Sequence, residues 1–180
     1  FDIGNTTRDA LMRFRETGDP IAGSTSEYSA GNGSLMRLSP TAVRYFHDRT
    51  RLAEIARRQS VVTHGAVEAV DACVAFADVL ADAIIGTPKT DLLKPRSRNV
   101  APAVVDIIAG SWRDKSRDEI QSTGYVVHSL EAAIWSVGNS SSFEEAVILA
   151  ANLADDADTV AAITGQIAGS IWGVTSIPVR

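Results

Sequence analysis

Residues 65–85 read GAVEAVDACVAFADVLADAII and are followed by Gly86. Apolar side chains recur in this stretch at steps of three and four residues, at Val67, Val70, Val74, Ala77 and Ala81. That spacing is the period of an α-helix, and glycine is typical of the position just after a helix end. The stretch therefore predicts a long helix that ends at Gly86.

The same period continues through most of the 180 residues, and the alternating pattern typical of strands is nearly absent. Start and stop signals predict further helices over residues 8–16, after Pro40, over 51–62, and from near 117, 143 and 158. Residues 19–33 (DPIAGSTSEYSAGNG) lack a period and predict a long loop. We expect an all-α fold, a compact helical bundle that forms a single domain over residues 1–180.

Local residue choices predict how several of these helices begin and pack. Asn5 or Thr6 is expected to cap the first helix, and Gly18 to end it. The pairs Ser116/Glu119 and Ser142/Glu145 have capping-box spacing, which places helix starts near 117 and 143. Glycines at 165, 169 and 173 predict that another backbone packs closely against the last helix.

The composition excludes several classes of protein. The chain has 17 basic and 22 acidic residues, a net charge of −5, 45% hydrophobic residues and one cysteine. Without a basic stripe it is not expected to bind nucleic acid through phosphates. The apolar run 160–174 is too short to span a membrane, so no membrane partner is expected. Cys73 cannot form an internal disulfide and no leader is recognisable, which favours a cytoplasmic location.

The strongest local signal is Asp155-Asp156-Ala157-Asp158-Thr159, at the start of the last helix. Clustered hard oxygen donors suit Mg²⁺, Mn²⁺ or Ca²⁺. The alternative is that acidic residues simply favour the positive end of a helix dipole, which explains one or two of the three carboxylates better than all of them. Helical spacing alone does not decide between Asp155 and Asp156 as the ligand.

Two segments are candidates for phosphate contacts. The glycine-hinged segment 29–37 (SAGNGSLMR) could cradle a phosphate on backbone N–H groups, although Asn-Gly is also a common turn dipeptide. Residues 87–99 carry Lys94, Arg96 and Arg98 close together and are interpreted first as a solvated loop, and only secondly as a phosphate contact.

Isolated chemistry-bearing residues carry weaker signals. His64 falls between two expected helices, where its ring either faces a cleft or serves as an ordinary hydrogen-bonded histidine. Cys73 lies mid-helix among apolar residues and is expected to be a small core side chain. No Ser/His/Asp set with recognisable spacing is present, so serine-hydrolase chemistry has no support.

Five segments, taken together and in order, resemble the ADP-ribosylglycohydrolase family. They are FDIGNTT (1–7), GNGSLMR (31–37), Thr63-His64, Gly124-Tyr125 and DDADT (155–159). The resemblance implies an all-α fold that holds two Mg²⁺ or Mn²⁺ ions. It also implies hydrolysis of ADP-ribose from protein side chains or from related small ADP-ribosyl conjugates. A non-catalytic ADP-ribose-binding or crystallin-like structural homologue is the alternative.

The resemblance also implies roles for individual residues. The positions that match its metal ligands are Asp156, Asp158 and Thr159. The positions that match its loop for the diphosphate and ribose are Ser29, Asn32 and Gly33. His64 matches a histidine near the ligand, and Gly124 and Tyr125 match a helix start near the adenosine. No residue of this chain is assigned as the catalytic acid or base.

Two departures from the family pattern stand out. The family carries an earlier segment with a Gly-Asp element, an acidic residue near the scissile bond and a Thr-Asp-Asp run of metal ligands. This chain starts after that point, so we expect an incomplete N-terminus, half a metal site, and a chain that is poorly stable and inactive by itself. Ala154 stands where many relatives have glycine, which is expected to tighten or shift the acidic turn.

Overall fold

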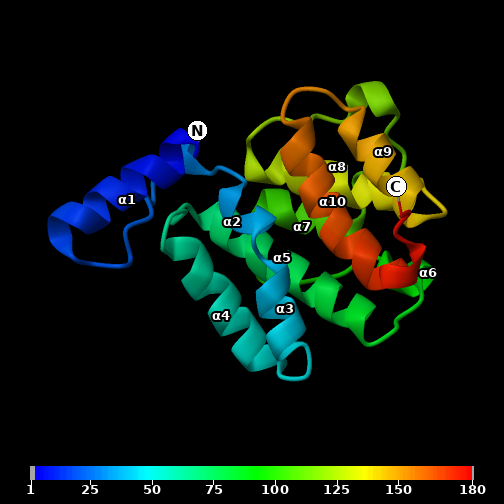
Figure 1. The fold of residues 1–180 in the computed structure, drawn as a ribbon, viewed down its shortest axis with the longest axis horizontal. Coiled ribbons are helices and arrows are strands. Elements are labelled where there is room, and N and C mark those ends of the chain that lie inside the picture. Colours follow the sequence, from blue (N-terminus) through cyan, green and yellow to red (C-terminus); the bar gives the residue numbers. More distant parts are fainter. Residues whose placement is uncertain (1–2, 180) are drawn as a thin grey trace.

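The computed structural model describes residues 3–179, and within that range the chain forms ten α-helices and no strand (Figure 1). The helices are α1 (Asn5–Thr17), α2 (Gly33–Met36), α3 (Ser39–Tyr45), α4 (Arg49–Val61), α5 (Val67–Ile84), α6 (Lys89–Leu92), α7 (Pro102–Ala109), α8 (Val126–Gly138), α9 (Phe143–Ala151) and α10 (Ala157–Trp172). Three 3₁₀ turns are η1 (Glu27–Ser29), η2 (Arg117–Glu119) and η3 (Val174–Ser176). The all-α prediction is confirmed.

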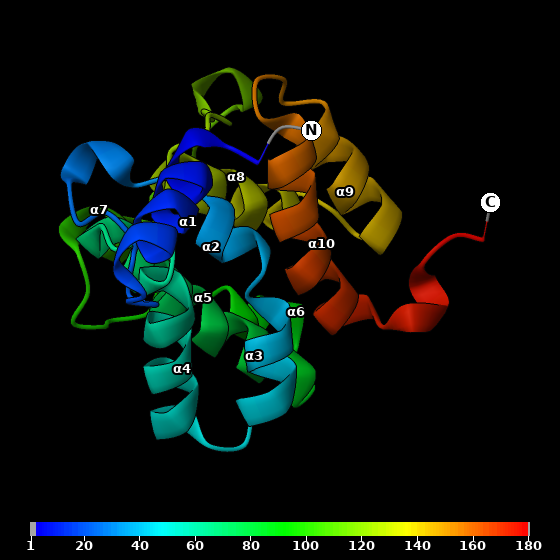
Figure 2. The same ribbon diagram turned by 60° about the vertical axis from the view of Figure 1, so that its left-hand side comes forward.

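Helix α5 lies at the centre of the bundle. It contacts α2, α3 and α4 as well as α7, α8 and α10, and Figure 2 shows it surrounded by them. Because neighbours cover it on most sides, its side chains are buried around nearly the whole circumference, including Val74, Phe76 and Leu80. A helix that is apolar all round belongs in the core, so the segment with the strongest helical period became the central element.

Several predicted boundaries are confirmed. Residues 8–16 lie in α1, residues 51–61 in α4 and residues 67–84 in α5, each with an end close to the predicted one. Gly18 ends α1 in the left-handed conformation at φ 72°. The Ser142 side chain accepts the Glu145 N–H and caps α9.

Two predictions about helix starts are wrong. Asn5 and Thr6 lie inside α1, whose N-cap is Gly4 without a side-chain cap. Ser116 and Glu119 do form their reciprocal contacts, but they close only the three-residue turn η2, and the next α-helix begins at Val126. A capping box fixes a turn, whereas a helix also needs a following apolar face to bury.

The glycines of α10 do not mark a close backbone contact. An added Cβ would have nothing within 4 Å at Gly165 or Gly173 and would meet only a Phe143 ring carbon, at 3.9 Å, at Gly169. Gly173 instead follows the helix end at φ 76°. The buried face of α10 consists of other residues, among them Val160, Ile163 and Ile167, which pack in the core.

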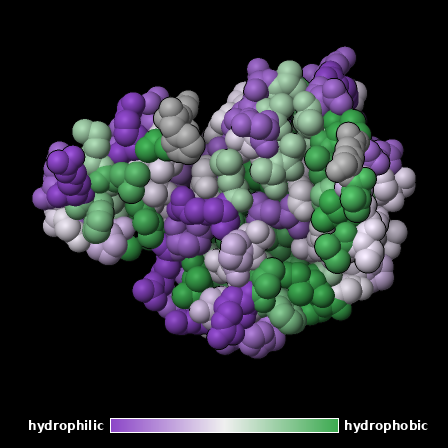
Figure 3. Space-filling model, viewed as in Figure 1, coloured by the Kyte–Doolittle hydropathy of each residue, from purple (hydrophilic) through white to green (hydrophobic). Residues whose placement is uncertain are grey.

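Helix α1 stands to one side of the main bundle (Figure 1). Ala10 is the one residue of α1 that is buried, whereas Leu11, Met12 and Phe14 are exposed. The space-filling view in Figure 3 shows hydrophobic surface on this lobe and hydrophilic residues where it joins the main body. Among the described residues, no helix combines the length and the apolar composition that a membrane span requires.

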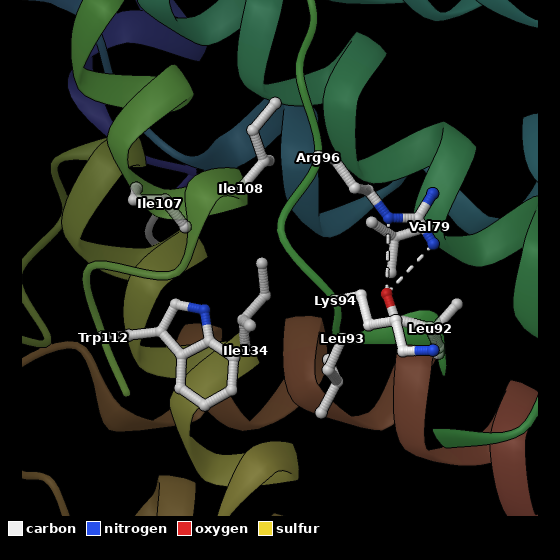
Figure 4. Close-up of a pocket in the computed structure, with 9 residues that line it drawn as sticks. All are labelled: Val79, Leu92, Leu93, Lys94, Arg96, Ile107, Ile108, Trp112 and Ile134. Atoms are coloured by element: carbon white, nitrogen blue, oxygen red, sulfur yellow. Dashed lines mark hydrogen bonds between the residues drawn. The ribbon is translucent and has the colours of Figure 1, made fainter. Parts of the chain in front are cut away.

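The basic segment that follows α5 is held by acidic side chains of the same protein. Arg96 pairs with Asp82 at 2.5 Å, and Arg98 pairs with Asp78. Both partners lie on α5. Figure 4 shows that Arg96 also donates to the Leu92 carbonyl beside a small apolar pocket between α5, α6, α7 and α8. These arginines fasten the loop to the core, so the expectation of a fully solvated loop is wrong for Arg96 and Arg98, while the phosphate contact stays untested.

Candidate ligand-binding and metal site

Two loops that are far apart in the sequence pair beside the start of α8. Gly31 and Tyr125 form an antiparallel bridge, flanked by two backbone hydrogen bonds. The Asn32 N–H donates to the Gly124 carbonyl at 3.1 Å, and the Val126 N–H donates to the Ala30 carbonyl at 3.0 Å. The glycine-hinged segment is therefore fixed to the segment around Gly124 and Tyr125 by main-chain contacts, which do not depend on side-chain identity.

Asn32 connects this pair of loops to the acidic turn. Its side-chain amide donates to Asp156 Oδ2 at 2.6 Å and to Ser129 Oγ at 2.8 Å. The Asp156 N–H in turn donates to the Ser122 carbonyl at 3.0 Å. Since the Asn32 side chain is buried, these bonds hold the Asp156 carboxylate in one orientation beside the glycine loop.

His64 lies against the other side of the glycine loop. Its backbone forms a parallel bridge with Ser24, and the residue is only 2% exposed. A Cβ on Gly33 would approach His64 Cε1 to 2.8 Å, and one on Gly31 would approach its Nε2 to 3.4 Å. Position 33 thus favours glycine because the imidazole ring lies so close, and not because of a positive backbone φ.

The surroundings of His64 keep it uncharged at neutral pH. Burial, together with the nearby positive charge of Arg37, lowers the pKa of the ring from 6.5 to about 4. Its Nδ1 lies 2.7 Å from the Thr63 hydroxyl. The ring therefore acts near pH 7 as a neutral hydrogen-bonding group.

Tyr125 is held at the rim of the site by a carboxylate. Its hydroxyl donates to Glu68 Oε2 at 2.6 Å, and its ring stands edge-on to His128 at 4.9 Å. Burial, together with the hydrogen bond and the negative charge of Glu68, raises the pKa of Tyr125 to about 12. The phenol consequently remains protonated and serves as a packing and hydrogen-bonding group.

The acidic turn has a different character. Ala154 and Asp155 both adopt positive φ, at 71° and 49°, and the chain then enters α10. Asp155 and Asp158 are exposed, and neither carboxylate has a hydrogen bond or ion pair with another described residue. Thr159 is buried in the first turn of α10. In residues 3–179 no three Asp, Glu, His or Cys side chains come close enough together to form a metal-ligand group.

The model of the ADP-ribosylglycohydrolase family matches residues 1–180. The chain belongs to the ADP-ribosylglycohydrolase family. It is 47% identical over 178 residues to an ADP-ribosylarginine hydrolase Tri1 of Pseudomonas putida (strain GB-1), covering 99% of this chain and 48% of that protein. It is 42% identical to an ADP-ribosylarginine hydrolase Tri1 of Serratia proteamaculans (strain 568), covering 99% of this chain and 49% of that protein.

A solved structure shares the fold of this family member. A chain from an ADP-ribosylglycohydrolase-related protein complex superposes with a TM-score of 0.88 at 40% sequence identity. The match covers 97% of this chain and 61% of that chain. The chain spans about half the length of the curated relatives it matches.

Most of the residues expected in the site of this family member are brought together by the fold. The glycine loop itself contributes Asn32 and Gly33. His64, Gly124 and Tyr125 lie against this loop, and Asp156 accepts a hydrogen bond from it. Ser29 is engaged elsewhere, because its hydroxyl donates to the carbonyls of Ser24 and Ser26. Ligand binding by any of these residues, and the metal contacts of Asp156, Asp158 and Thr159, stay predictions.

The sequence patterns did not single out three residues that support the site. Ser129 Oγ accepts from the Asn32 amide, and the Ser122 carbonyl accepts from the Asp156 N–H. The Glu68 carboxylate accepts from the Tyr125 hydroxyl. Ser129 lies four residues after Tyr125, one turn further along α8, which is a signal that could have been used. No short-range pattern pointed to Ser122 or Glu68, because both meet their partners only through the packing of distant segments.

Proposed function

We propose that the complete protein removes ADP-ribose from modified arginine side chains of proteins. The proposal is supported by membership of the family and by the two relatives described as ADP-ribosylarginine hydrolases, which are 42–47% identical over nearly the whole chain. Because the chain spans about half of those relatives, the activity is assigned to the whole protein and not to residues 1–180 alone.

The observation that carries the proposal is the hydrogen bond between Asn32 and Asp156. It joins two segments 124 residues apart at 2.6 Å. One segment is a glycine-hinged loop suited to a diphosphate, and the other is an acidic turn suited to divalent cations. A ligand that carries both a diphosphate and a ribose with free hydroxyls matches that pair of neighbours, and ADP-ribose is such a ligand.

The acidic turn supplies the donor types that a hard divalent cation prefers. Asp156, Asp158 and Thr159 offer two carboxylates and a hydroxyl, and no basic side chain of the described residues pairs with either acid. They would hold two Mg²⁺ or Mn²⁺ ions together with ligands from outside this chain. Bound cations would polarise the ribose oxygens and lower the pKa of a nearby water.

The chain's own residues then have separate tasks in this proposal. The glycine loop binds the diphosphate through backbone N–H groups, and Asn32 fixes the direction of the Asp156 carboxylate. Tyr125, a protonated phenol held by Glu68, forms one wall near the adenosine. His64 lies against the loop as a neutral ring.

The test is release of ADP-ribose from an ADP-ribosylarginine protein by the complete protein with Mg²⁺ or Mn²⁺ present. We expect turnover by the wild type and none by Asp156→Asn. The matched control is Asp118→Asn, which removes a carboxylate that is 93% exposed on η2, outside the site. Binding of ADP-ribose without any turnover of ADP-ribosylarginine would contradict the proposal and favour a non-catalytic ADP-ribose-binding protein.

A further inference from the structure

His64 is the end of a hydrogen-bonded series that begins at Arg37. The Arg37 guanidinium donates to the Thr63 hydroxyl at 2.7 Å, and Thr63 Oγ1 lies 2.7 Å from His64 Nδ1. A second bond from Arg37, to the Gln59 carbonyl at 2.7 Å, fixes the guanidinium on the last turns of α4. The Thr63 hydroxyl is therefore held between the Arg37 guanidinium and the His64 ring.

The donors and acceptors in this series determine where the imidazole proton lies. A guanidinium can only donate, so the Thr63 oxygen accepts from Arg37. The hydroxyl hydrogen of Thr63 then needs an acceptor, and among the described residues the one within reach is His64 Nδ1. The reverse arrangement, with a hydrogen on Nδ1, would leave the hydroxyl hydrogen of a 5% exposed side chain without a partner, which is costly.

We infer that Thr63, oriented by Arg37, is a positioning residue that fixes His64 as the tautomer with its hydrogen on Nε2, directed at the Gly31–Gly33 segment. Nε2 is the ring nitrogen closest to where side chains at positions 31 and 33 would begin, and it has no hydrogen bond to another described residue. The ring consequently offers one neutral donor at the loop. An oxygen of a ligand seated on the loop is its acceptor.

This arrangement adds a donor without adding a charge. A protonated ring would place a second positive charge beside Arg37, whose charge already lowers the pKa of His64. The neutral Nε2–H can instead bind a phosphate or a ribose oxygen by a hydrogen bond of ordinary strength. Thr63 acts through His64 and does not touch the ligand.

The first measurement is the tautomer of His64 in the complete wild-type protein, read from nitrogen–proton correlation spectra of ¹⁵N-histidine-labelled protein. We expect the pattern of an Nε2–H tautomer, assigned with His64→Gln. A wild-type ring that carries its hydrogen on Nδ1 would overturn the inference, and this reading does not require any variant to fold.

The second measurement is ADP-ribose affinity by calorimetry. Thr63→Val removes the hydroxyl at nearly constant shape, and we expect it to weaken binding on the order of fivefold and to yield mixed tautomers, whereas Thr63→Ser restores both. Thr50→Val, an exposed threonine on α4, is the matched control. Loss of affinity in Thr63→Ser equal to that in Thr63→Val would overturn the inference, as would an unchanged tautomer in both Thr63→Val and Arg37→Met.

The affinity measurement rests on the proposed function, because it assumes that ADP-ribose binds at the glycine loop. The two can fail separately. A protein that binds ADP-ribose and shows the expected tautomer but does not cleave ADP-ribosylarginine would refute the proposed function and leave the role of Thr63 in place. A protein that cleaves ADP-ribosylarginine but carries the His64 hydrogen on Nδ1 would support the proposed function and refute the role of Thr63.

Discussion

The two sides of the candidate site are built in opposite ways. On one side the Gly31–Gly33 segment and His64 are closely packed, and the ring is buried and hydrogen-bonded. On the other side, residues 154–158 form a turn with two residues at positive φ and two exposed carboxylates without a partner among the described residues. The glycine loop is thus packed by residues of this chain, whereas the acidic turn keeps exposed carboxylates, which we propose as cation ligands.

The sharpest way to break this comparison is to remove the charges of the acidic turn. Asp156→Asn combined with Asp158→Asn should abolish measurable Mg²⁺ or Mn²⁺ binding to the complete protein, because both carboxylates are taken as ligands and not as packing elements. Calorimetric titration with each metal provides the measurement. Metal-free stability should fall by only about 1 kcal/mol, because neither substitution opens a cavity and Asp156→Asn replaces the charge-assisted bond from Asn32 by a neutral one.

Asp155→Asn is the matched control for that double variant. Asp155 is an exposed carboxylate in the same turn, and it is the ligand that helical spacing alone did not exclude. It should retain metal binding. Unchanged binding in the double variant, or a loss of binding in Asp155→Asn, would show that the assignment to Asp156 and Asp158 is wrong.

Acid should lower the free energy of unfolding through the buried His64. Because its pKa is about 4 in the folded protein and 6.5 ordinarily, the unfolded chain takes up the proton first as pH falls. Stability should therefore fall between about pH 6.5 and pH 4, by up to about 3 kcal/mol from this group. Chemical unfolding of the complete protein across this range measures it.

His64→Gln should flatten this part of the pH profile. His47→Gln is the matched control, since it removes an exposed imidazole from the connection between α3 and α4 and sets the background. If the wild type and His64→Gln lose the same free energy of unfolding from pH 6.5 to pH 4, His64 is not buried as a neutral ring.

A larger side chain between the glycine loop and His64 should weaken ADP-ribose binding. Gly33→Val places a branched side chain where a single Cβ would already lie 2.8 Å from the His64 ring. Overpacking of this kind costs about 1–3 kcal/mol, so ADP-ribose binding should weaken by about tenfold or more. Arg96→Ala is the comparison, because it removes a charge that is paired with Asp82. A greater loss of binding in Arg96→Ala would move the phosphate site to the basic segment.

The smallest expected effect concerns the backbone of the acidic turn. Ala154→Gly should stabilise the protein by up to about 1 kcal/mol, because alanine is strained at φ 71° while glycine is not, and the gain is partly offset by the greater freedom of glycine in the unfolded chain. Thermal unfolding of both proteins provides the measurement. A destabilised Ala154→Gly variant would mean that the turn is not strained at this position.

The sequence by itself predicted the fold class, the limits of several helices and the segments that carry the candidate site, but its periodicity gave no limits for α7 and α8. Apolar spacing in residues 65–85 predicted the long helix, and Gly18 and Ser142 set local ends through contacts within a few residues. The motifs at 31–37 and 155–159 identified the loop and the turn, and the family match agrees with them. Such signals are readable because they depend on neighbours in the chain.

Only the tertiary structure decided what depends on distant partners. It showed that Asn32 reaches Asp156, that Glu68 holds Tyr125 and that Arg96 and Arg98 pair with α5. It also showed that the glycines of α10 do not receive another backbone and that the Ser116 capping box closes a single turn. A residue's spacing tells which side chains share a face of its own helix, but the partner across the interface is fixed only when the core packs, since that partner lies anywhere along the chain.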